Sequence, residues 1–401
     1  MKINSGHLTY CSNIYSGESW EDHFDALKKS FPLIKQQVSP DEPMGLGLRL
    51  SNLASIDLIT EGNLKVFRQW LTDNQCYVFT MNGFPFGGFH HTRVKDQVHA
   101  PDWTTKERLD YTLRLFHILT KLLPEDMEGG ISTSPLSYKP WFNNKEKLAK
   151  AKALATENIL LVADELHAIR QRTGILLHLD IEPEPDGFLE SGREFINWFE
   201  NDLLIKGIER FRDKLKISAF KAETILRRHI GLCYDVCHFA IGYEPHAEII
   251  QELTSKKIKV GKIQISAALK ARVPQTSGER QLVFNEFSRF NESTYLHQVI
   301  AKSTNGDLIR YPDLPDALSD SGNPDVAEWR AHFHVPVFNG DFGLLKSTQS
   351  DIVQVLEIFS RIPFTHHLEV ETYTWDVLPE ALKLPLNQSV IRELEWVRSI
   401  L

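Results

Sequence analysis

Short apolar segments alternate with amphipathic stretches along nearly the whole of this 401-residue chain. Such alternation is typical of repeated β-α units, which build a parallel sheet covered by helices. A helix is expected from Thr104 onward, because Glu107 three residues later completes a capping-box pattern. The predicted strands are residues 7–13, 45–51, 76–84, 130–135, 174–185, 231–239, 260–267 and 366–375.

Eight strands with helices between them predict an α/β fold, a (β/α)8 TIM barrel that spans residues 1–401 as a single domain. A doubly wound open sheet is the alternative, but no Gly-x-Gly-x-x-Gly follows the first strand. Residues 270–330 break the alternation and are rich in Ser, Asn, Pro and Asp. Because long irregular segments in compact domains are usually functional, we interpret 270–330 as a loop region inserted between the seventh and eighth strands.

The charge and the hydropathy pattern exclude several classes of partner. A formal net charge of −8 gives no general attraction to phosphate backbones, so no nucleic-acid binding is expected. No apolar run approaches the roughly 20 residues of a membrane span, and the amino-terminal residues lack a secretory-signal pattern, so no membrane insertion is expected. Cys233 and Cys237 are separated by three residues rather than the two of redox motifs. We therefore expect a cytoplasmic protein with reduced, buried thiols.

Ligand-type side chains gather at the predicted strand ends, where TIM barrels place their function. His178, Asp180 and Glu182 alternate with apolar residues in the fifth strand, so they share one face. An inward-facing row of this kind needs a partner for its charge, and a metal ion supplies one. Glu182 stands at the strand end, directly before Pro183.

Other strand ends carry the same types of residue. Asp235 and His238 follow the sixth strand, and Glu371 follows an apolar entry into the eighth. The strand-like segment 331–338 places His332 and His334 on one face. Two carboxylates, an aspartate and a histidine suit a divalent metal such as Mn, Mg, Co, Fe or Zn. A polar cavity that binds no metal is the alternative.

Glu182-Pro183, Asp235-x-x-His238 and Glu371 together resemble the xylose isomerase-like barrels, which include sugar isomerases, ketose epimerases, inosose dehydratases and endonuclease IV. The resemblance implies that Glu182, Asp235 and Glu371 are metal ligands. It also implies that Glu182 and Glu371 act as catalytic acid and base, with His238 contacting the substrate. The family's fourth ligand is a histidine in the seventh strand, where this chain has Gln264. We expect His334 to replace it, with His332 or Gln264 as the alternatives.

A second resemblance covers nearly the full length. The segments HLTYCSNIYSGESW, NGFPFGGFH, STSPLSYKPW, HFHVPVF and HLEVETYTW, in this order, are similar to the EboE family of metabolite traffic proteins. That family is itself a set of xylose isomerase-like barrels encoded in bacterial ebo gene clusters. The resemblance implies a role in processing or moving a secondary-metabolite precursor, with partners from the same gene cluster.

Polar and aromatic residues around the predicted strand ends suit a ring-bearing small molecule, whether sugar or metabolite. The expected substrate-binding residues are His7, Asn82, Tyr138, Gln264, His332 and Trp375.

Two functions remain from the sequence. The first is a metal-dependent isomerase or epimerase that moves a proton on a small carbonyl or polyhydroxylated substrate. The second is a binding or trafficking protein that uses the barrel to hold a metabolite without turnover. An endonuclease IV-like activity is disfavoured by the net charge. Barrels of this class often pair, so a homo-oligomer is also considered.

Overall fold

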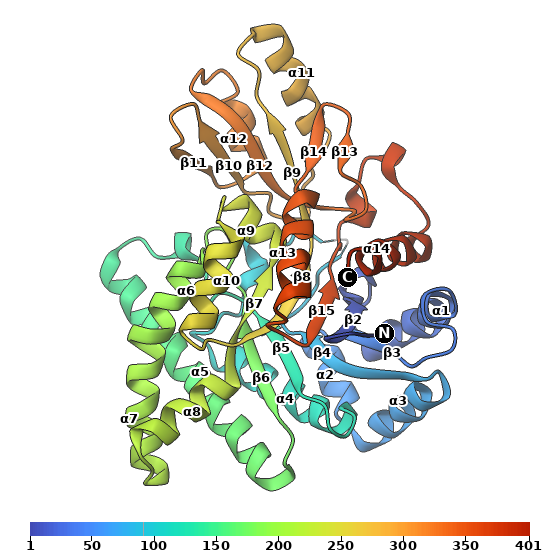
Figure 1. Ribbon diagram of the computed structural model, residues 1–401, viewed down its shortest axis with the longest axis vertical. Coiled ribbons are helices and arrows are strands. Elements are labelled where there is room, and N and C mark those ends of the chain that lie inside the picture. The colour runs from blue at the N-terminus through green and yellow to red at the C-terminus, as the bar shows by residue number, and fades with distance from the viewer. Residues whose placement is uncertain (91) are drawn as a thin grey trace.

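A closed ring of parallel strands forms the centre of the molecule in this computed structural model, which describes residues 1–90 and 92–401 (Figure 1). Neighbouring strands follow the order β2-β15-β8-β7-β6-β5-β4-β3. A parallel bridge between Cys11 and Gly47 joins the two ends of this order, and Thr9 Oγ1 donates to Gly45 O at 2.8 Å beside it. The predicted TIM barrel is therefore confirmed. Its strands are β2 (Gly6–Tyr10), β3 (Met44–Arg49), β4 (Cys76–Asn82), β5 (Gly129–Thr133), β6 (Leu177–Ile181), β7 (Ile230–Asp235), β8 (Val260–Ile265) and β15 (His367–Val370), and β1 (Lys2–Ile3) pairs antiparallel with β2.

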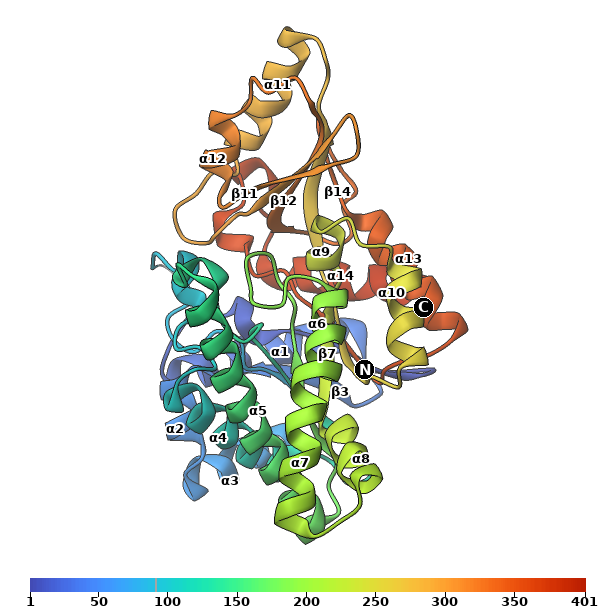
Figure 2. The same ribbon diagram turned by 90° about the vertical axis from the view of Figure 1, so that its left-hand side faces the viewer.

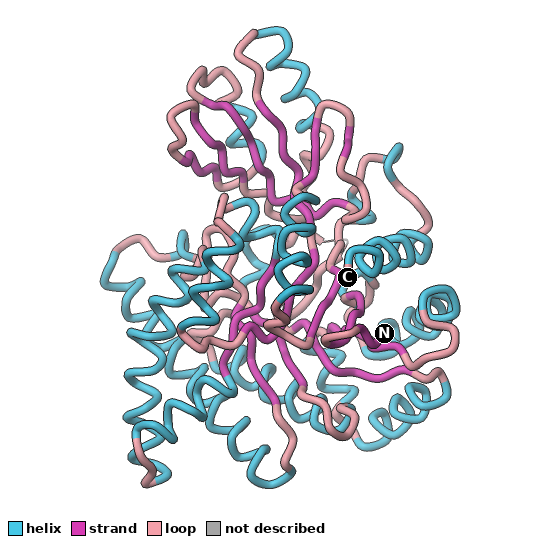
Figure 3. The backbone as a smooth tube through the Cα atoms, viewed as in Figure 1, coloured by secondary structure: helices cyan, strands magenta, loops and turns pink. Residues whose placement is uncertain are grey.

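Helices surround the ring on the outside (Figure 3). Several begin at side chains that accept a hydrogen bond from the first turn, as Ser51 does from Ala54 N. The helix expected from Thr104 is capped one residue later, by Thr105. The helices are α1 (Trp20–Val38), α2 (Asn52–Leu58), α3 (Glu61–Asp73), α4 (Lys106–Leu122), α5 (Lys145–Thr173), α6 (Gly192–Trp198), α7 (Leu204–Leu215), α8 (Ala219–His229), α9 (Val236–Ile241), α10 (His246–Ser255), α13 (Gln349–Arg361) and α14 (Leu386–Ile400). Within the described chain, none of them combines the length and the apolar character that a membrane crossing requires.

Between β8 and β15 the chain builds a second, antiparallel sheet that stands beyond the barrel (Figures 1 and 2). Its strand order is β11-β10-β12-β9-β14-β13. Trp329 of β12 packs against Phe284 and Phe287 of α11, with ring centroids 4.5 and 5.4 Å apart, and this gives the sheet an apolar core. Residues 270–330, expected as an inserted loop region, thus contain helices and strands, while the domain division stays a prediction. The elements are β9 (Ala267–Arg272), α11 (Ser277–Ser288), β10 (Val299–Ser303), β11 (Leu308–Tyr311), α12 (Leu314–Ser319), β12 (Val326–Val335), β13 (Asp341–Phe342) and β14 (Leu345–Ser347).

The pairing of β12 with β9 is interrupted between Ala331 and Val335. Such irregularities re-aim the side chains of the strand that carries them. The interrupted stretch contains His332 and His334, and both histidines line a cavity at the barrel. The inserted sheet therefore positions two residues of the candidate site.

The barrel interior is polar, whereas TIM barrels are usually filled by layers of branched apolar side chains. Lys262 of β8 and Glu369 of β15 form an ion pair in which both side chains are fully buried. Gly47 makes room for this pair, because a Cβ there would lie 1.9 Å from Glu369 Oε1. Glu371 directly follows β15, two residues after Glu369, so the two side chains lie on one face of the extended chain and the ion pair lies directly beneath the candidate site.

The buried carboxyl group of Glu393, on α14, predicts a pH-dependent stability. Burial raises the pKa of Glu393 to about 8, against hydrogen bonds from Thr372 Oγ1 and Val337 N that lower it. A pKa above the unfolded value means that the native state binds the extra proton, so stability is fully present below pH 4.5 and is lost as the pH rises toward 8. Between pH 4.5 and 8, we expect the free energy of unfolding of Glu393→Gln to fall less steeply with pH than that of wild type, by up to about 1.4 kcal/mol per pH unit. Urea unfolding at pH 5, 6, 7 and 8 measures the difference.

Glu395→Gln is the matched control, because Glu395 lies on the same helix and is exposed. Equal pH slopes for wild type and Glu393→Gln would contradict the prediction.

Candidate metal centre

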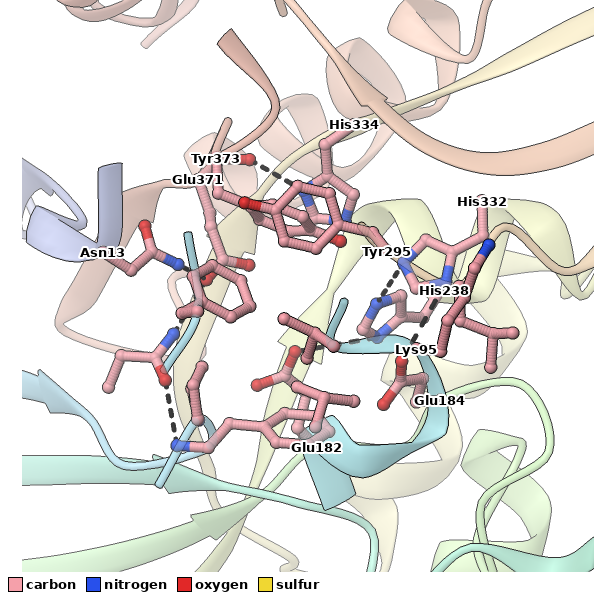
Figure 4. A pocket seen from close by; sticks show the side chains of 17 residues that line it. Asn13, Lys95, Glu182, Glu184, His238, Tyr295, His332, His334, Glu371 and Tyr373 are labelled. Atoms are coloured by element: carbon pink, nitrogen blue, oxygen red, sulfur yellow. Dashed lines mark hydrogen bonds and ion pairs between the residues drawn. The ribbon is translucent and has the colours of Figure 1, made fainter. Parts of the chain in front are cut away.

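A cavity opens at the carboxyl ends of the barrel strands, on the side where the inserted sheet stands (Figure 4). About 510 Å³ of space not occupied by protein atoms lies between its walls and at its open mouth. Carboxylates and imidazoles line one part of it, and aromatic and aliphatic side chains line the other, which matches the composition of small-molecule sites. The lining residues are Asn13, Asn82, Phe84, Pro85, Phe89, Val94, Lys95, Val98, Glu182, Glu184, His238, Tyr295, Leu296, His332, His334, Glu371 and Tyr373.

Three carboxylates from three strand ends converge at the base of this cavity. Carboxylate oxygens of Glu182, Asp235 and Glu371 lie within 4.8 Å of one another. The amide Nε2 of Gln264 donates to all three, at 3.1 Å to Glu182 Oε1, 3.3 Å to Asp235 Oδ2 and 2.5 Å to Glu371 Oε2. The Sγ–H of Cys233 donates to Gln264 Oε1 at 3.1 Å and fixes this orientation of the amide.

The carboxylates are held by other side chains as well. Asp235 caps α9 by accepting from His238 N, and its Oδ1 also accepts from Ser266 Oγ at 2.6 Å. Oε1 of Glu371 accepts from Asn13 Nδ2 at 2.8 Å and from Asn82 Nδ2 at 2.7 Å. These contacts leave Asp235 Oδ2 and Glu371 Oε2 turned toward the shared centre.

Two atoms at this centre have no hydrogen-bond partner in the described part of the chain, Glu182 Oε2 and His334 Nε2. His334 Nδ1 donates to the carbonyl oxygen of Glu371 at 3.0 Å, so in the neutral ring Nε2 carries the lone pair. Burial lowers the pKa of His334 to about 4, which keeps the ring neutral at pH 7. Nitrogens of His334 and His238 lie within 4.8 Å of Asp235.

The electrostatics of the trio call for a cation. Burial, together with the charges of Glu371 and Asp235, raises the pKa of Glu182 well above its ordinary value. Burial and the charge of Asp235 raise the pKa of Glu371 to about 8. Without a cation, the buried trio therefore carries protons at neutral pH; a divalent metal satisfies the same oxygens and removes the need for them. The donor set, carboxylate oxygens plus one neutral imidazole, fits such a metal.

A second group of side chains adjoins the trio. His238 Nδ1 donates to Pro183 O at 2.9 Å, and His332 Nδ1 donates to Gln298 Oε1 at 2.8 Å. Their Nε2 atoms face one another at 3.2 Å, and Glu184 lies within 4.8 Å of both rings. Because two neutral imidazoles held in this way would oppose lone pairs, the contact needs a shared proton or a cation.

The expected substrate-binding residues divide into two sets. Asn82, Gln264 and His332 lie at the site, where Asn82 and Gln264 hold carboxylates. His7 lies at the opposite end of the barrel, since it is near the start of β2, and its Nδ1 contacts Tyr77 Oη at 2.7 Å. The remaining two are outside the lining: Tyr138 stacks on His99 with ring centroids 5.0 Å apart, and Trp375 is buried beyond β15.

The sequence interpretation passed over several residues of the cavity. Glu184 was missed, although the run Glu182-Pro183-Glu184-Pro185 repeats the ligand-type pattern that singled out Glu182. Lys95, Tyr295 and Ser266 carry no signal of their own, because only the folded chain brings Lys95 and Tyr295 to the cavity lining and Ser266 to Asp235.

No model of a known protein family matches the sequence, and no curated protein sequence matches it. Solved structures resemble the fold. A xylose isomerase-like TIM-barrel protein from Mycobacterium smegmatis, in complex with magnesium, has a TM-score of 0.53 and 9% identity over 100% of this chain and 98% of that chain. The IolI protein with a bound zinc atom has a TM-score of 0.48 and 12% sequence identity, over 98% of this chain and 97% of that chain. A D-tagatose 3-epimerase-like protein has a TM-score of 0.47 and 9% sequence identity, over 98% of this chain and 96% of that chain. The TM-score above 0.5 with the Mycobacterium smegmatis protein shows that the chain has the fold of that xylose isomerase-like TIM barrel.

Proposed function

We propose that this chain is a divalent-metal-dependent enzyme of isomerase or epimerase type, which moves a proton on a small carbonyl or polyhydroxylated substrate. The observation that carries the proposal is the convergence of Glu182, Asp235 and Glu371 on one point, with unpartnered atoms of Glu182 and His334 beside it among the described residues. The Mycobacterium smegmatis barrel of the same fold is in complex with magnesium, which supports the choice of a divalent cation.

The proposed ligands are Glu182, Asp235, Glu371 and His334. A metal bound there polarises a carbonyl oxygen and makes the neighbouring carbon more acidic. Glu182 and Glu371 extend from β6 and β15, which β7 and β8 separate in the ring, so the two carboxylates approach a substrate from different sides. One takes a proton from carbon and the other returns a proton to the opposite face. Asn13 and Asn82 hold Glu371 in place for this transfer.

The rest of the cavity suits a small, partly apolar substrate. His238 and His332 present Nε2 atoms that accept a hydrogen bond from a substrate hydroxyl. Phe89, Tyr295 and Tyr373 pack on one another with ring centroids 5.0 to 5.2 Å apart and keep water from the carboxylates. As the EboE resemblance implies, we propose that the substrate is a secondary-metabolite precursor, and that proteins of the same gene cluster supply or receive it.

The experiment combines metal binding with proton exchange. Chelator-treated full-length protein is titrated with Mn²⁺, and Asp235→Asn is expected to weaken binding by about 100-fold or more, because a metal ligand is lost. Ketohexoses and inososes are then incubated with the Mn²⁺-loaded protein in D₂O. We expect NMR to show metal-dependent loss of a carbon-bound proton from at least one compound, and no loss with Asp235→Asn.

A second candidate function is a metabolite-binding protein without turnover. The observation that favours it is the Gln264 amide, which donates to all three carboxylates and closes the centre without a metal. Ligand binding by calorimetry with no deuterium incorporation, and unchanged binding in Asp235→Asn, would support this function and contradict the enzyme.

A further inference from the structure

A second cluster of ligand-type side chains lies at the other end of the barrel, away from the cavity described above. A carboxylate oxygen of Glu128 and a ring nitrogen each of His178 and His367 lie within 4.8 Å of one another. Glu128 directly precedes β5, His178 belongs to β6 and His367 to β15. Because β7 and β8 separate β6 from β15 in the ring, the two histidines meet across the barrel interior, with ring centroids 5.2 Å apart.

Hydrogen bonds fix which ring nitrogens are left over. His178 Nδ1 contacts both oxygens of Asp180, at 2.9 and 2.8 Å, and His367 Nε2 donates to Glu128 O at 3.2 Å. The remaining nitrogens, His178 Nε2 and His367 Nδ1, have no hydrogen-bond partner within residues 1–90 and 92–401. Both rings are at most 1% exposed, so solvent does not satisfy these atoms. Two buried ring nitrogens without hydrogen-bond partners, next to the Glu128 carboxylate, are suited to bind a cation.

Glycines occupy the barrel positions next to His178 and Asp180, where a larger side chain would clash. A Cβ at Gly130 would lie 2.3 Å from His178 Cε1. At Gly261 it would lie 1.8 Å from Asp180 Oδ1, and at Gly231 it would lie 2.8 Å from the same atom. Glycines of β5, β7 and β8 thus leave the space that the His178–Asp180 pair fills. A histidine whose second nitrogen is held by a carboxylate is the usual arrangement of a metal-ligating imidazole.

The cluster is reached from solvent. An open depression lined by His7, Glu128 and His367 lies at this end of the barrel. Lys259 Nζ contacts Glu128 Oε2 at 2.8 Å, so Oε1 is the oxygen left for a ligand. The positive charge of Lys259 opposes a bound cation and sets its affinity below what three ligands alone would give.

We propose that Glu128, His178 and His367 form a second divalent-cation site, which closes the amino-terminal end of the barrel. Two imidazoles and one carboxylate, with a water molecule in the fourth position, are a donor set typical of Zn²⁺. The amino-terminal end of a TIM barrel serves stability, so the expected effect of the cation is to tie β6 and β15 together. This site is independent of the proposed enzyme, which uses the opposite end.

The test counts Zn²⁺ per chain in full-length protein after chelation, reloading and gel filtration. His367→Gln is expected to hold one Zn²⁺ fewer than His366→Gln, its exposed neighbour and matched control. Lys259→Met is expected to bind this Zn²⁺ about 3- to 10-fold more tightly by removing a competing charge, and Glu128→Gln to bind it at least about 10-fold more weakly. Zn²⁺ is also expected to raise the Tm of Asp235→Asn protein, in which the carboxylate centre has lost a ligand and this site is intact.

Equal Zn²⁺ content in His367→Gln and His366→Gln would overturn the proposal. If His367→Gln fails to fold, the Zn²⁺ affinities of Lys259→Met and Glu128→Gln decide, because the proposal predicts tighter binding in the first and weaker binding in the second. If Lys259 and Glu128 form only an ion pair and hold no metal, neither substitution changes Zn²⁺ binding, and that result would overturn the proposal. The experiment tests the two metal sites separately. If only Asp235→Asn loses Zn²⁺, the carboxylate centre is supported and the Glu128–His178–His367 site is contradicted.

Discussion

Lys262→Met is expected to lower the free energy of unfolding by about 3–5 kcal/mol. Lys262 and Glu369 are both fully buried in the barrel interior, and their charges meet there without solvent. Burial alone lowers the pKa of Lys262, but the Glu369 carboxylate reverses this effect and raises the pKa above its ordinary value. Removing the ammonium group leaves Glu369 buried without its counter-charge, which is the costly state. Urea unfolding at pH 7 gives the difference.

The double variant Lys262→Met/Glu369→Met is expected to recover most of the lost stability, because a buried ion pair is often replaceable by apolar side chains. Lys106→Met is the control, since Lys106 pairs with Asp110 on the surface and its loss should cost less than about 1 kcal/mol. A Lys262→Met variant as stable as Lys106→Met would contradict the interpretation.

Glu182→Gln is expected to reduce proton exchange on the substrate that the ketose panel identifies by about 10²- to 10⁴-fold, the usual contribution of a general acid or base. The oxygen that accepts from Gln264 is retained in the amide, so the site should keep its arrangement. The measurement is deuterium incorporation at saturating Mn²⁺, which separates the loss of the proton-transfer group from a weaker metal affinity.

Glu380→Gln serves as the control, because Glu380 is 89% exposed and belongs to none of the ligand-type clusters found among the described residues. Exchange by Glu182→Gln at the wild-type rate would exclude Glu182 as the acid or base, whatever the metal content.

Much of the fold could be predicted from the sequence. Strand periodicity located the barrel strands, as in 260–267 against the observed Val260–Ile265. Some helices gave no recognised signal, α1 and α14 among them. Helix α1 contains Pro32, which normally interrupts a helix, and α14 begins after a proline without a side-chain cap. The order within 270–330 could not be predicted either, because its antiparallel sheet pairs β9 with β12, whose residues are more than fifty positions apart.

The sequence predicted the location of a site residue only where the residue's position in a strand determines which way its side chain points. Glu182, Asp235 and Glu371 follow apolar strand cores, so their location at the carboxyl ends came from periodicity and a family resemblance. His178 and Asp180 share a face with Glu182, but the row divides: His178 and Asp180 pair with each other deeper in the barrel. His7 was misassigned for a different reason: it is the first residue of the predicted strand 7–13, and the start of a barrel strand lies at the end opposite the site.

The most direct test of the carboxylate centre is an anomalous difference map from a crystal of the full chain soaked with Mn²⁺. The account predicts a peak bounded by Glu182, Asp235, Glu371 and His334, with the Gln264 amide displaced from the three carboxylates or turned to present its oxygen. A map with no peak there at saturating Mn²⁺, and with Gln264 still donating to all three carboxylates, would contradict it.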